Sequence, residues 1–433
     1  MRCDVHSSPH AHIPYDPYAG NILTSKLSHI LERKEVFRSL LHSPPLPPDP
    51  ETLQGIPKEV RLHMLMDVQD LHLPNPDSYR MFTTVDLLIR QGYRSRSPTN
   101  PRTWGRISGE AQGSTANRVP GGAALVVGPS GVGKSVAILK TLSLYPQIIK
   151  HEHFPHLVGT HHQVVWLSVN VPSSGKMGDL AVSLMTEWDD LTSTTVADGH
   201  RRFSQTLSRL RNRGPDLMNE WQQVAQSHFL GCLHLDEVQN FFKLPTLAQR
   251  RKAMKGDSLE LSIVDDMALK SILTFVNMSG IPIIMSGTPD GVAALAKRFS
   301  NIQRLVRSGF HRMDPYSGPE DPDFITFMSH ISRYQYVIKR LPADSALREV
   351  FYAKTAGVNR LVIALWIAGH RCAYERSADD LRISDFEKAS RTYLAPAMDA
   401  VQALLSKDPS LMCRYEDMMP KGDQVWAFMP ERS

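Results

Sequence analysis

A glycine-rich octapeptide, GPSGVGKS, occupies residues 128–135 of this 433-residue chain. It follows the apolar run AALVV and precedes SVAILKTLSLY, so it lies where a strand ends and a helix begins. Its glycines allow backbone N–H groups to curl around an anion without interference from a Cβ atom. The lysine can reach the β- and γ-phosphates, and the serine hydroxyl suits Mg²⁺. The pattern therefore predicts a site for ATP with Mg²⁺, formed by Gly128, Pro129, Ser130, Gly131, Val132, Gly133, Lys134, Ser135 and Val136.

Two adjacent carboxylates, Asp236 and Glu237, come directly after the apolar run CLHL. Ligands bind at the carboxyl ends of strands in parallel sheets, so a buried strand would deliver both side chains to the phosphate site. There Asp236 would hold Mg²⁺ together with Ser135, and Glu237 would polarise the attacking water. Alternatively, the pair could only cap the next helix. Because they follow a phosphate-binding loop, we expect the hydrolytic roles.

A third apolar run, IIMSGT at residues 283–288, ends in small polar residues. If its strand lies beside that of the phosphate-binding loop, Ser286 or Thr288 could form a hydrogen bond with the γ-phosphate or the lytic water. A turn rich in small residues is the alternative interpretation.

Short aliphatic runs that alternate with helical segments must position these residues. The runs AALVVG, QVVWLSVN, FLGCLHLDE and IPIIMSGT have the composition of strands buried on both faces. Their alternation with helices predicts an α/β fold with a parallel sheet flanked by helices. After residue 315 the strand patterns stop. A small helical lid is then predicted from the helical patterns at 323–340, 344–355, 358–374 and 383–405.

Polar and proline-rich stretches divide the chain into five parts. Before the core, helical patterns cover 21–42, 58–71 and 83–91, and PPLPPDP interrupts them. The long spacing between Lys134 and Asp236 predicts an inserted helical pair within 189–220. The expected parts are a flexible tail at 1–20, a helical N-terminal extension that binds a partner or DNA at 21–112, a nucleotide-binding core at 113–316, the lid at 317–405 and a C-terminal tail at 406–433.

Together these motifs resemble those of AAA+ ATPases and, within that superfamily, those of the transposition regulators TnsC and TniB. The resemblance covers about residues 115–375 and depends on GPSGVGKS, on VVWLSVNVP followed by SSGKMGDLAVSLM, on LHLDEVQNF and on IPIIMSGTP. It implies that Thr288 is the sensor-1 residue and that Arg360 is the nucleotide-binding sensor-2 residue. It also implies that Arg298 is the arginine finger, with Arg304 and Arg307 as rivals. A finger reaches the γ-phosphate of a neighbouring subunit, so hydrolysis would require assembly into a ring or helical filament.

Two basic segments without acidic residues favour contact with nucleic-acid phosphates. Residues 200–213 carry five arginines, and residues 90–106 carry five more, interleaved with Tyr93 and Trp104. A solvated charged surface is the alternative for either segment. In TnsC-like proteins the turn after the second strand faces DNA, which corresponds here to residues 173–176. We expect binding to double-stranded DNA with little sequence preference, through Lys176, Arg201, Arg202 and Arg209.

Composition argues against several other classes of protein. The apolar runs are too short to cross a bilayer, and the first residues lack the apolar stretch of a signal peptide, so we expect a cytoplasmic protein without a membrane partner. The four cysteines are widely spaced, as in proteins with reduced thiols. A net charge of +5 permits binding to nucleic acid but does not require it.

The resemblance implies an ATP-dependent regulator of DNA transposition. Such a protein oligomerises on duplex DNA and marks the target site. It recruits a TnsB- or TniA-like transposase, which the tail at 406–433 could dock, alongside a TniQ-like targeting subunit. ATP hydrolysis then disassembles the complex. Two alternatives stay open. One is an origin-recognition-type initiator or helicase loader, although residues 376–433 look too short and irregular for its usual winged-helix domain. The other is a signalling ATPase switch that does not bind DNA.

Overall fold

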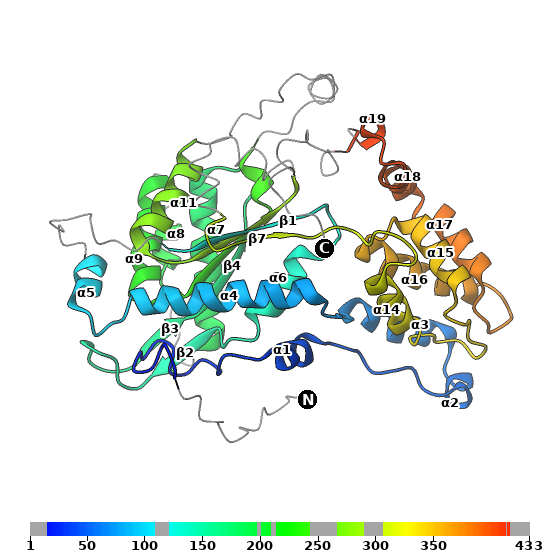
Figure 1. The fold of residues 1–433 in the computed structure, drawn as a ribbon, viewed down its shortest axis with the longest axis horizontal. Coiled ribbons are helices and arrows are strands. Elements are labelled where there is room, and N and C mark those ends of the chain that lie inside the picture. The colour runs from blue at the N-terminus through cyan, green and yellow to red at the C-terminus, as the bar shows by residue number, and fades with distance from the viewer. Residues whose placement is uncertain are drawn as a thin grey trace.

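A central parallel sheet organises the fold (Figure 1). The computed structural model describes residues 15–108, 121–196, 201–208, 214–242, 266–289, 306–412 and 414–415. Five strands form the sheet in the order β4-β5-β6-β1-β7, and all neighbours are parallel. Their bounds are β1 Ala123–Val127, β4 Trp166–Asn170, β5 Cys232–Asp236, β6 Ile283–Gly287 and β7 Gly309–Arg312. With helices on both faces and a C-terminal helical region, the expected α/β fold is confirmed.

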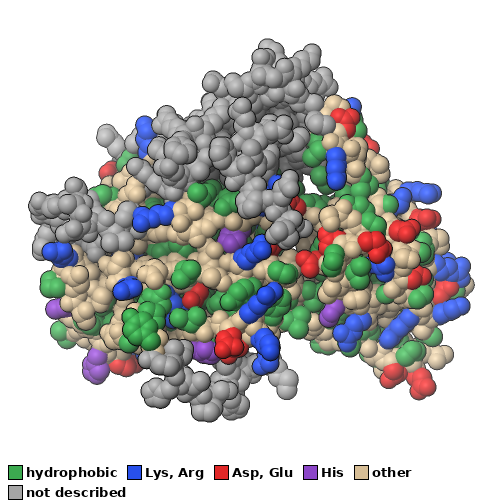
Figure 2. Space-filling model, in the orientation of Figure 1, with side chains coloured by type: hydrophobic (Ala, Val, Ile, Leu, Met, Phe, Trp, Pro, Cys, Tyr) green, Lys and Arg blue, Asp and Glu red, His purple; other side chains and the backbone are tan. Residues whose placement is uncertain are grey.

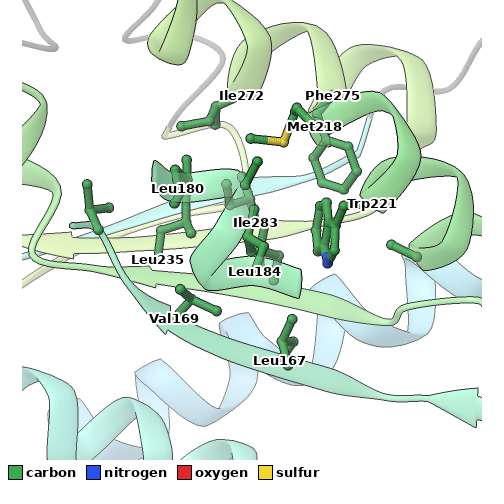
Figure 3. Close-up of a cluster of buried hydrophobic side chains, with 14 of the residues drawn as sticks. Leu167, Val169, Leu180, Leu184, Met218, Trp221, Leu235, Ile272, Phe275 and Ile283 are labelled. Atoms are coloured by element: carbon green, nitrogen blue, oxygen red, sulfur yellow. The ribbon is translucent and has the colours of Figure 1, made fainter. Parts of the chain in front are cut away.

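Helices α7, α9 and α11 cover one face of the sheet (Figure 3). Their bounds are Met177–Thr195, Gly214–Ser227 and Asp266–Ser279. Successive side chains of a strand point to opposite faces, so Leu233 and Leu235 of β5 both point towards these helices. They join one apolar cluster with Leu184 of α7, Trp221 of α9 and Phe275 of α11. This cluster holds the helices on the sheet, whose strands β1, β5 and β6 are buried along their whole length.

The opposite face is covered by α6 (Lys134–Leu142), the long helix α4 (Pro76–Ser95) and the segment around α1 (Arg33–Leu40). Asn75 begins α4, because its side chain accepts a hydrogen bond from the Ser78 N–H at 3.0 Å and a proline takes the first helical position. The buried side of α4 then packs against the alternate residues of β1 and against α6. The N-terminal segment is therefore the second helical layer of the core.

The helix predicted over residues 21–42 forms only as α1. The preceding residues form turns, because the Thr24 hydroxyl donates to the Asn21 carbonyl at 3.0 Å and the Asn21 side chain accepts from the Leu23 N–H at 3.1 Å. Such local hydrogen bonds compete with those of a helix. Leu23 is nevertheless completely buried, which explains the apolar periodicity of the segment.

The lid consists mainly of four helices, α14 Pro322–Ile331, α15 Ser345–Thr355, α16 Asn359–Tyr374 and α17 Ile383–Thr392, followed by α18 Met398–Ser406 and α19 Pro409–Met412. The last predicted helix is divided, because a short 3-10 turn at Ala395–Ala397, which contains a proline, separates α17 from α18. Three early elements also pack into the lid: α2 Pro50–Gln54, α3 Lys58–Leu65 and η1 Met66–Asp70. The lid is thus built from two separate stretches of sequence (Figure 1).

Several elements differ from the expectation. Strand β7 was not predicted, and the run QVVWLSVN is divided between β4 and β3 (His161–Val164), which pairs with β2 (Ile148–His151) in an antiparallel hairpin. The helical pair expected within 189–220 differs in its bounds, because the two helices that follow α7 are α8 (Ser204–Ser208) and α9, and α9 continues to Ser227. Among the described residues of that range, α7 continues to Thr195 and α9 begins at Gly214.

One further helix, α5 (Pro101–Ile107), follows α4. Within the described ranges, no single helix is both long and apolar enough to span a membrane; α15 and α16 meet the length and composition only as a pair bent by 115°.

Candidate nucleotide-binding site

The phosphate-binding loop joins β1 to α6, and its glycines adopt conformations that other residues avoid. Gly131 and Gly133 have φ angles of 84° and 98°, in the left-handed region. A Cβ atom at Gly128 would come within 2.1 Å of a backbone carbonyl oxygen. Lys134 Nζ donates to two carbonyl oxygens of the loop at 2.7 and 2.9 Å, so its charge lies over the loop. This arrangement presents N–H groups and one cation to a phosphate chain.

Asp236, at the end of β5, contacts the first turn of α6. Its carboxylate accepts hydrogen bonds from the Ser135 hydroxyl and, at 2.6 Å, from the Ser286 hydroxyl. Burial alone raises the pKa of the Asp236 carboxyl, but the hydrogen bonds from Ser135 and Ser286 lower it below its usual value overall. Asp236 is therefore ionised at neutral pH.

Ser135 and Asp236 could bind Mg²⁺ together with a nucleotide and water, whereas a metal ion held only by protein side chains would need more ligands. No cluster of three or more His, Cys, Asp or Glu side chains suited to a metal ion occurs among the described residues. Mg²⁺ usually takes one or two carboxylates together with substrate phosphates and water. A hydroxyl and a carboxylate oxygen in contact beside a phosphate-binding loop provide the protein part of such a site.

Glu237 lies at the same edge of the sheet and is exposed. Its φ of 57° places it in the left-handed region, which is uncommon for a residue with a side chain. Its carboxylate accepts a hydrogen bond from the Gln239 side-chain amide, and Gln239 Oε1 in turn accepts from the Thr288 N–H at 3.2 Å. In the described structure the Glu237 side chain does not cap the 3-10 turn Val238–Phe241, so its carboxylate stays available to solvent or substrate.

Gln239 was not singled out by the sequence analysis, although it connects the ends of β5 and β6. Its two partners, Glu237 at the end of β5 and the buried Thr288 at the end of β6, are residues that the sequence assigned to hydrolysis. A polar residue two positions after Glu237 was the available signal. Its partner on β6 could not be inferred without the strand order.

A cavity of about 640 Å³ lies between the phosphate-binding loop and the lid. Two contacts join its walls: Asn359 Nδ2 donates to the Val132 carbonyl at 3.2 Å, and the Arg360 N–H donates to the Gly131 carbonyl at 3.0 Å. The Arg360 side chain lines the cavity together with Val136 of α6. A cavity of this size that opens onto the loop can accommodate a nucleoside.

Residues 69–78 form another wall of this cavity and were not predicted to belong to the site. Within them, His72 pairs with His42 through two backbone hydrogen bonds of 2.9 Å. Burial, with smaller effects from Lys140 and His42, lowers the pKa of His72 to about 4. Its imidazole is therefore neutral at pH 7. The pattern LHLPNP indicates only a break before a helix, so the sequence offered no sign of this role.

The residues predicted to contact DNA are only partly described. Lys176 is exposed at the residue that precedes α7. Arg201 and Arg202 are also exposed, and they form ion pairs with Asp190 at 3.2 Å and with Glu220 at 3.6 Å. The acids missing from the local sequence are thus supplied by α7 and α9. Three further predicted residues, Arg209, Arg298 and Arg304, lie outside the described residues, whereas Arg307 is exposed just before β7.

Part of the second basic segment, residues 90–106, has a structural role, whereas Arg94 and Arg102 are exposed, so the expected contact with nucleic acid stays a prediction for these two. Arg90 is buried and forms an ion pair with Asp86 at 2.7 Å, and Arg96 is buried and donates to the Leu230 carbonyl at 2.8 Å. Tyr93 is completely buried. Trp104 packs edge-to-face against two phenylalanines, so neither aromatic ring is presented for base stacking.

The face shown in Figure 2 carries mixed charge. Over the lid, at the right of the view, Lys and Arg side chains alternate with Asp and Glu. Two close ion pairs of the lid, Arg376 with Asp380 at 2.7 Å and Arg382 with Asp380 at 2.6 Å, are of this kind. This part of the surface therefore lacks the single sign of charge expected of a DNA-binding groove.

The fold and the site are similar to those of AAA-type P-loop ATPases. The family described as "AAA domain" matches residues 118–295, which run from just before β1 to just beyond β6. A comparison with curated proteins finds no significant match.

Solved structures that are similar to this chain include the following three. The Aeropyrum pernix ORC2 protein in its ADPNP–ADP complexes is 13% identical, with 71% of this chain and 77% of that chain covered and a TM-score of 0.37. Drosophila ORC bound to DNA is 14% identical over 64% and 57% of the two chains, with a TM-score of 0.34. The Thermotoga maritima RuvB Holliday junction branch migration motor is 13% identical over 72% and 68%, with a TM-score of 0.33.

Proposed function

We propose that this protein is a Mg²⁺-dependent ATPase whose hydrolysis is regulatory and whose ATP-bound form assembles on duplex DNA to direct transposition. The observation that carries the ATPase part is the contact between Ser135 and Asp236, with Lys134 and Glu237 at the same edge of the sheet. In this proposal Ser135 and Asp236 hold Mg²⁺, Lys134 neutralises the phosphates and Glu237 orients the attacking water.

In this proposal a second subunit completes the site. Among the described residues that line the cavity, Arg360 is contributed by the lid of the same chain. We assign the trans-acting arginine to Arg298, with Arg307 as the described alternative. A finger supplied in trans accelerates hydrolysis by about 10³–10⁵-fold, so an isolated subunit should hydrolyse ATP slowly. The ring or helical filament is then the active form.

The DNA-binding surface that we propose lies at the N-terminal ends of α7 and α9. These ends lie side by side, because a Cβ atom on Gly214 would be 2.9 Å from the Gly178 nitrogen. Lys176 is exposed immediately before α7, and Gly214 follows the arginine-containing segment 209–213 in the sequence. Adjacent helix N-termini with a free cation favour phosphate groups and offer no base-specific contacts. Arg201 and Arg202 would exchange their exposed carboxylate partners for phosphates.

The transposition role is supported by the sequence motifs that resemble TnsC and TniB. In this proposal the protein acts in the cytoplasm, marks a target site and recruits a TnsB- or TniA-like transposase together with a TniQ-like targeting subunit. An initiator and a DNA-independent switch would differ from a transposition regulator in how they assemble and what they bind. The following experiment distinguishes the three roles.

The test is electron microscopy of the full chain with duplex DNA and a non-hydrolysable ATP analogue. Rings or filaments that require both ligands support the proposal, and Lys176→Glu should abolish them. The matched control is Lys34→Glu, an exposed lysine on α1 at the opposite face of the sheet. ATPase activity without any DNA-dependent assembly would instead favour the signalling switch. Assembly that leaves a purified TnsB-like transposase unbound, together with binding to a replicative helicase, would favour the initiator.

A further inference from the structure

Three polar side chains, those of Ser168, His234 and Ser286, form a continuous hydrogen-bonded chain that leads to Asp236 across three strands. Ser168 Oγ lies 2.8 Å from His234 Nδ1, and His234 Nε2 lies 2.8 Å from Ser286 Oγ. Ser286 Oγ lies 2.6 Å from Asp236 Oδ1, while the other carboxylate oxygen accepts from the Ser135 hydroxyl. The chain therefore connects the edge strand β4 to the phosphate-binding loop.

The strand register brings these side chains to one face of the sheet. Ser168 on β4 is directly opposite His234 on β5, and His234 is opposite Ile284 on β6. Side chains two residues apart on a strand share a face, so Ser286 and Asp236 lie on the same side as His234, one step nearer the carboxyl edge. Both His234 and Ser286 are completely buried.

The directions of the two hydrogen bonds nearest Asp236 follow from the charge of its carboxylate. An ionised carboxylate only accepts, so Ser286 must use its single proton towards Asp236. The Ser286 oxygen is then the acceptor for His234, which requires a proton on Nε2. In a neutral imidazole Nδ1 carries no proton, and it accepts from the Ser168 hydroxyl. Both ring nitrogens are thereby satisfied, which removes the free-energy cost of burying them.

We propose that His234 is a positioning residue for the Asp236 carboxylate: through Ser286 it holds Asp236 Oδ1, so that Oδ2 faces Ser135 at the Mg²⁺ site. An aliphatic side chain at this position would pack in the strand equally well but would leave the Ser286 hydroxyl free to rotate away from Asp236. Partners that orient a metal ligand typically change metal affinity by about 10–100-fold when they are removed. The proposal rests on the Mg²⁺-ATP site proposed above.

The first test measures the binding of a non-hydrolysable ATP analogue to the full chain during titration with Mg²⁺. In His234→Leu, we expect the half-saturating Mg²⁺ concentration to rise about tenfold, while affinity for the analogue in EDTA stays within about twofold of the wild type. His234→Gln carries one donor and one acceptor and should restore much of the loss. Cys232→Ala removes a buried side chain from the same strand and face, and it should behave as the wild type. An unchanged Mg²⁺ midpoint in His234→Leu would overturn the proposal.

The second test examines the hydrogen bonds of His234 by NMR spectroscopy, in the absence of nucleotide. The ¹⁵N chemical shifts of the His234 ring should show a neutral imidazole protonated at Nε2, and Ser286→Ala should change the Nε2 shift more than the Nδ1 shift. A proton on Nδ1 would contradict the proposed chain of hydrogen bonds, whatever the enzyme does with nucleotide. If instead the His234 tautomer is as expected but Mg²⁺ does not tighten binding of the analogue to the wild type, then the proposed Mg²⁺-ATP site fails, and with it the role assigned to His234.

Discussion

Arg61 of α3 forms an ion pair with Asp379 of the lid, 318 residues further along the chain, with 2.6 Å between Nη2 and Oδ2. The Arg61 side chain is only 4% exposed, and it also donates to the Tyr336 carbonyl at 3.1 Å. Lys58, one helical turn earlier, donates to the Arg376 carbonyl at 2.6 Å. An early helix is therefore fixed to the lid by polar contacts as well as by apolar packing.

Replacing Arg61 with alanine should destabilise the lid by about 3 kcal/mol, because it leaves the Asp379 carboxylate partly buried without its partner. Denaturant unfolding of the full chain measures the change in the free energy of unfolding. The control is Arg80→Ala, which removes an arginine that is 68% exposed from its pair with Asp77 and should cost less than about 1 kcal/mol. Equal losses in the two variants would show that the Arg61–Asp379 ion pair contributes no more than an exposed pair.

Exchange of Glu237 for glutamine should separate nucleotide binding from hydrolysis. The amide cannot accept a proton from water, so the hydrolysis rate should fall by about 10²–10⁴-fold, while affinity for the ATP analogue stays near that of the wild type. Lys134→Ala should weaken binding of the analogue itself, since it removes the cation over the loop. Rapid hydrolysis by Glu237→Gln would mean that another group orients the water.

Gly357, between α15 and α16, should not tolerate a side chain. Its φ is 70°, and a Cβ atom would lie 2.7 Å from the Tyr316 carbonyl oxygen. Gly357→Ala should therefore lower the free energy of unfolding by at least about 2 kcal/mol and weaken nucleotide binding, because Gly357 lines the cavity. Gly159→Ala is the matched control. Gly159 has a φ of 89°, and no atom of the described residues lies within 4 Å of the position of an added Cβ atom. This substitution should therefore cost only about 1 kcal/mol.

His161 should make the protein sensitive to acid. Burial, with smaller effects from His228 and His151, lowers the pKa of His161 to about 3. Because the unfolded chain binds this proton near pH 6.5, stability is lost progressively as the pH falls from about 6.5 towards 3. His161→Phe should therefore lose less stability than the wild type between pH 7.5 and 4.5, as measured by urea midpoints. His153→Phe, at an exposed position, should keep the wild-type acid sensitivity.

The parts of the site that could be predicted are those whose signal is local in sequence. The phosphate-binding loop needs glycines and a lysine at fixed spacing, and Asp236 follows a run of buried residues, so both could be recognised without the fold. Gln239 and residues 69–78 could not, because their partners on β6 and in the lid are distant in sequence. The same holds for β7, whose residues are only half-buried and do not form an apolar run.

Arg90 and Arg96 of the second basic segment show the opposite error, in which a local pattern suggested too much. Asp86 lies four residues before Arg90 on the same helix, just outside the acid-free window, so a wider window would have revealed the pair. The carbonyl partner of Arg96 lies 134 residues away and could be found only in the structure.

The division of the lid between two stretches of sequence also affects the order in which the protein can fold during synthesis. Residues 66–321 lie between the end of α3 and the start of α14. At about 5–20 residues per second, a ribosome needs more than ten seconds to add them. During that interval Leu53 and Leu65, both completely buried in the finished fold, have no lid to cover them. The nascent chain therefore exposes an apolar surface that chaperones can bind until the last helices emerge.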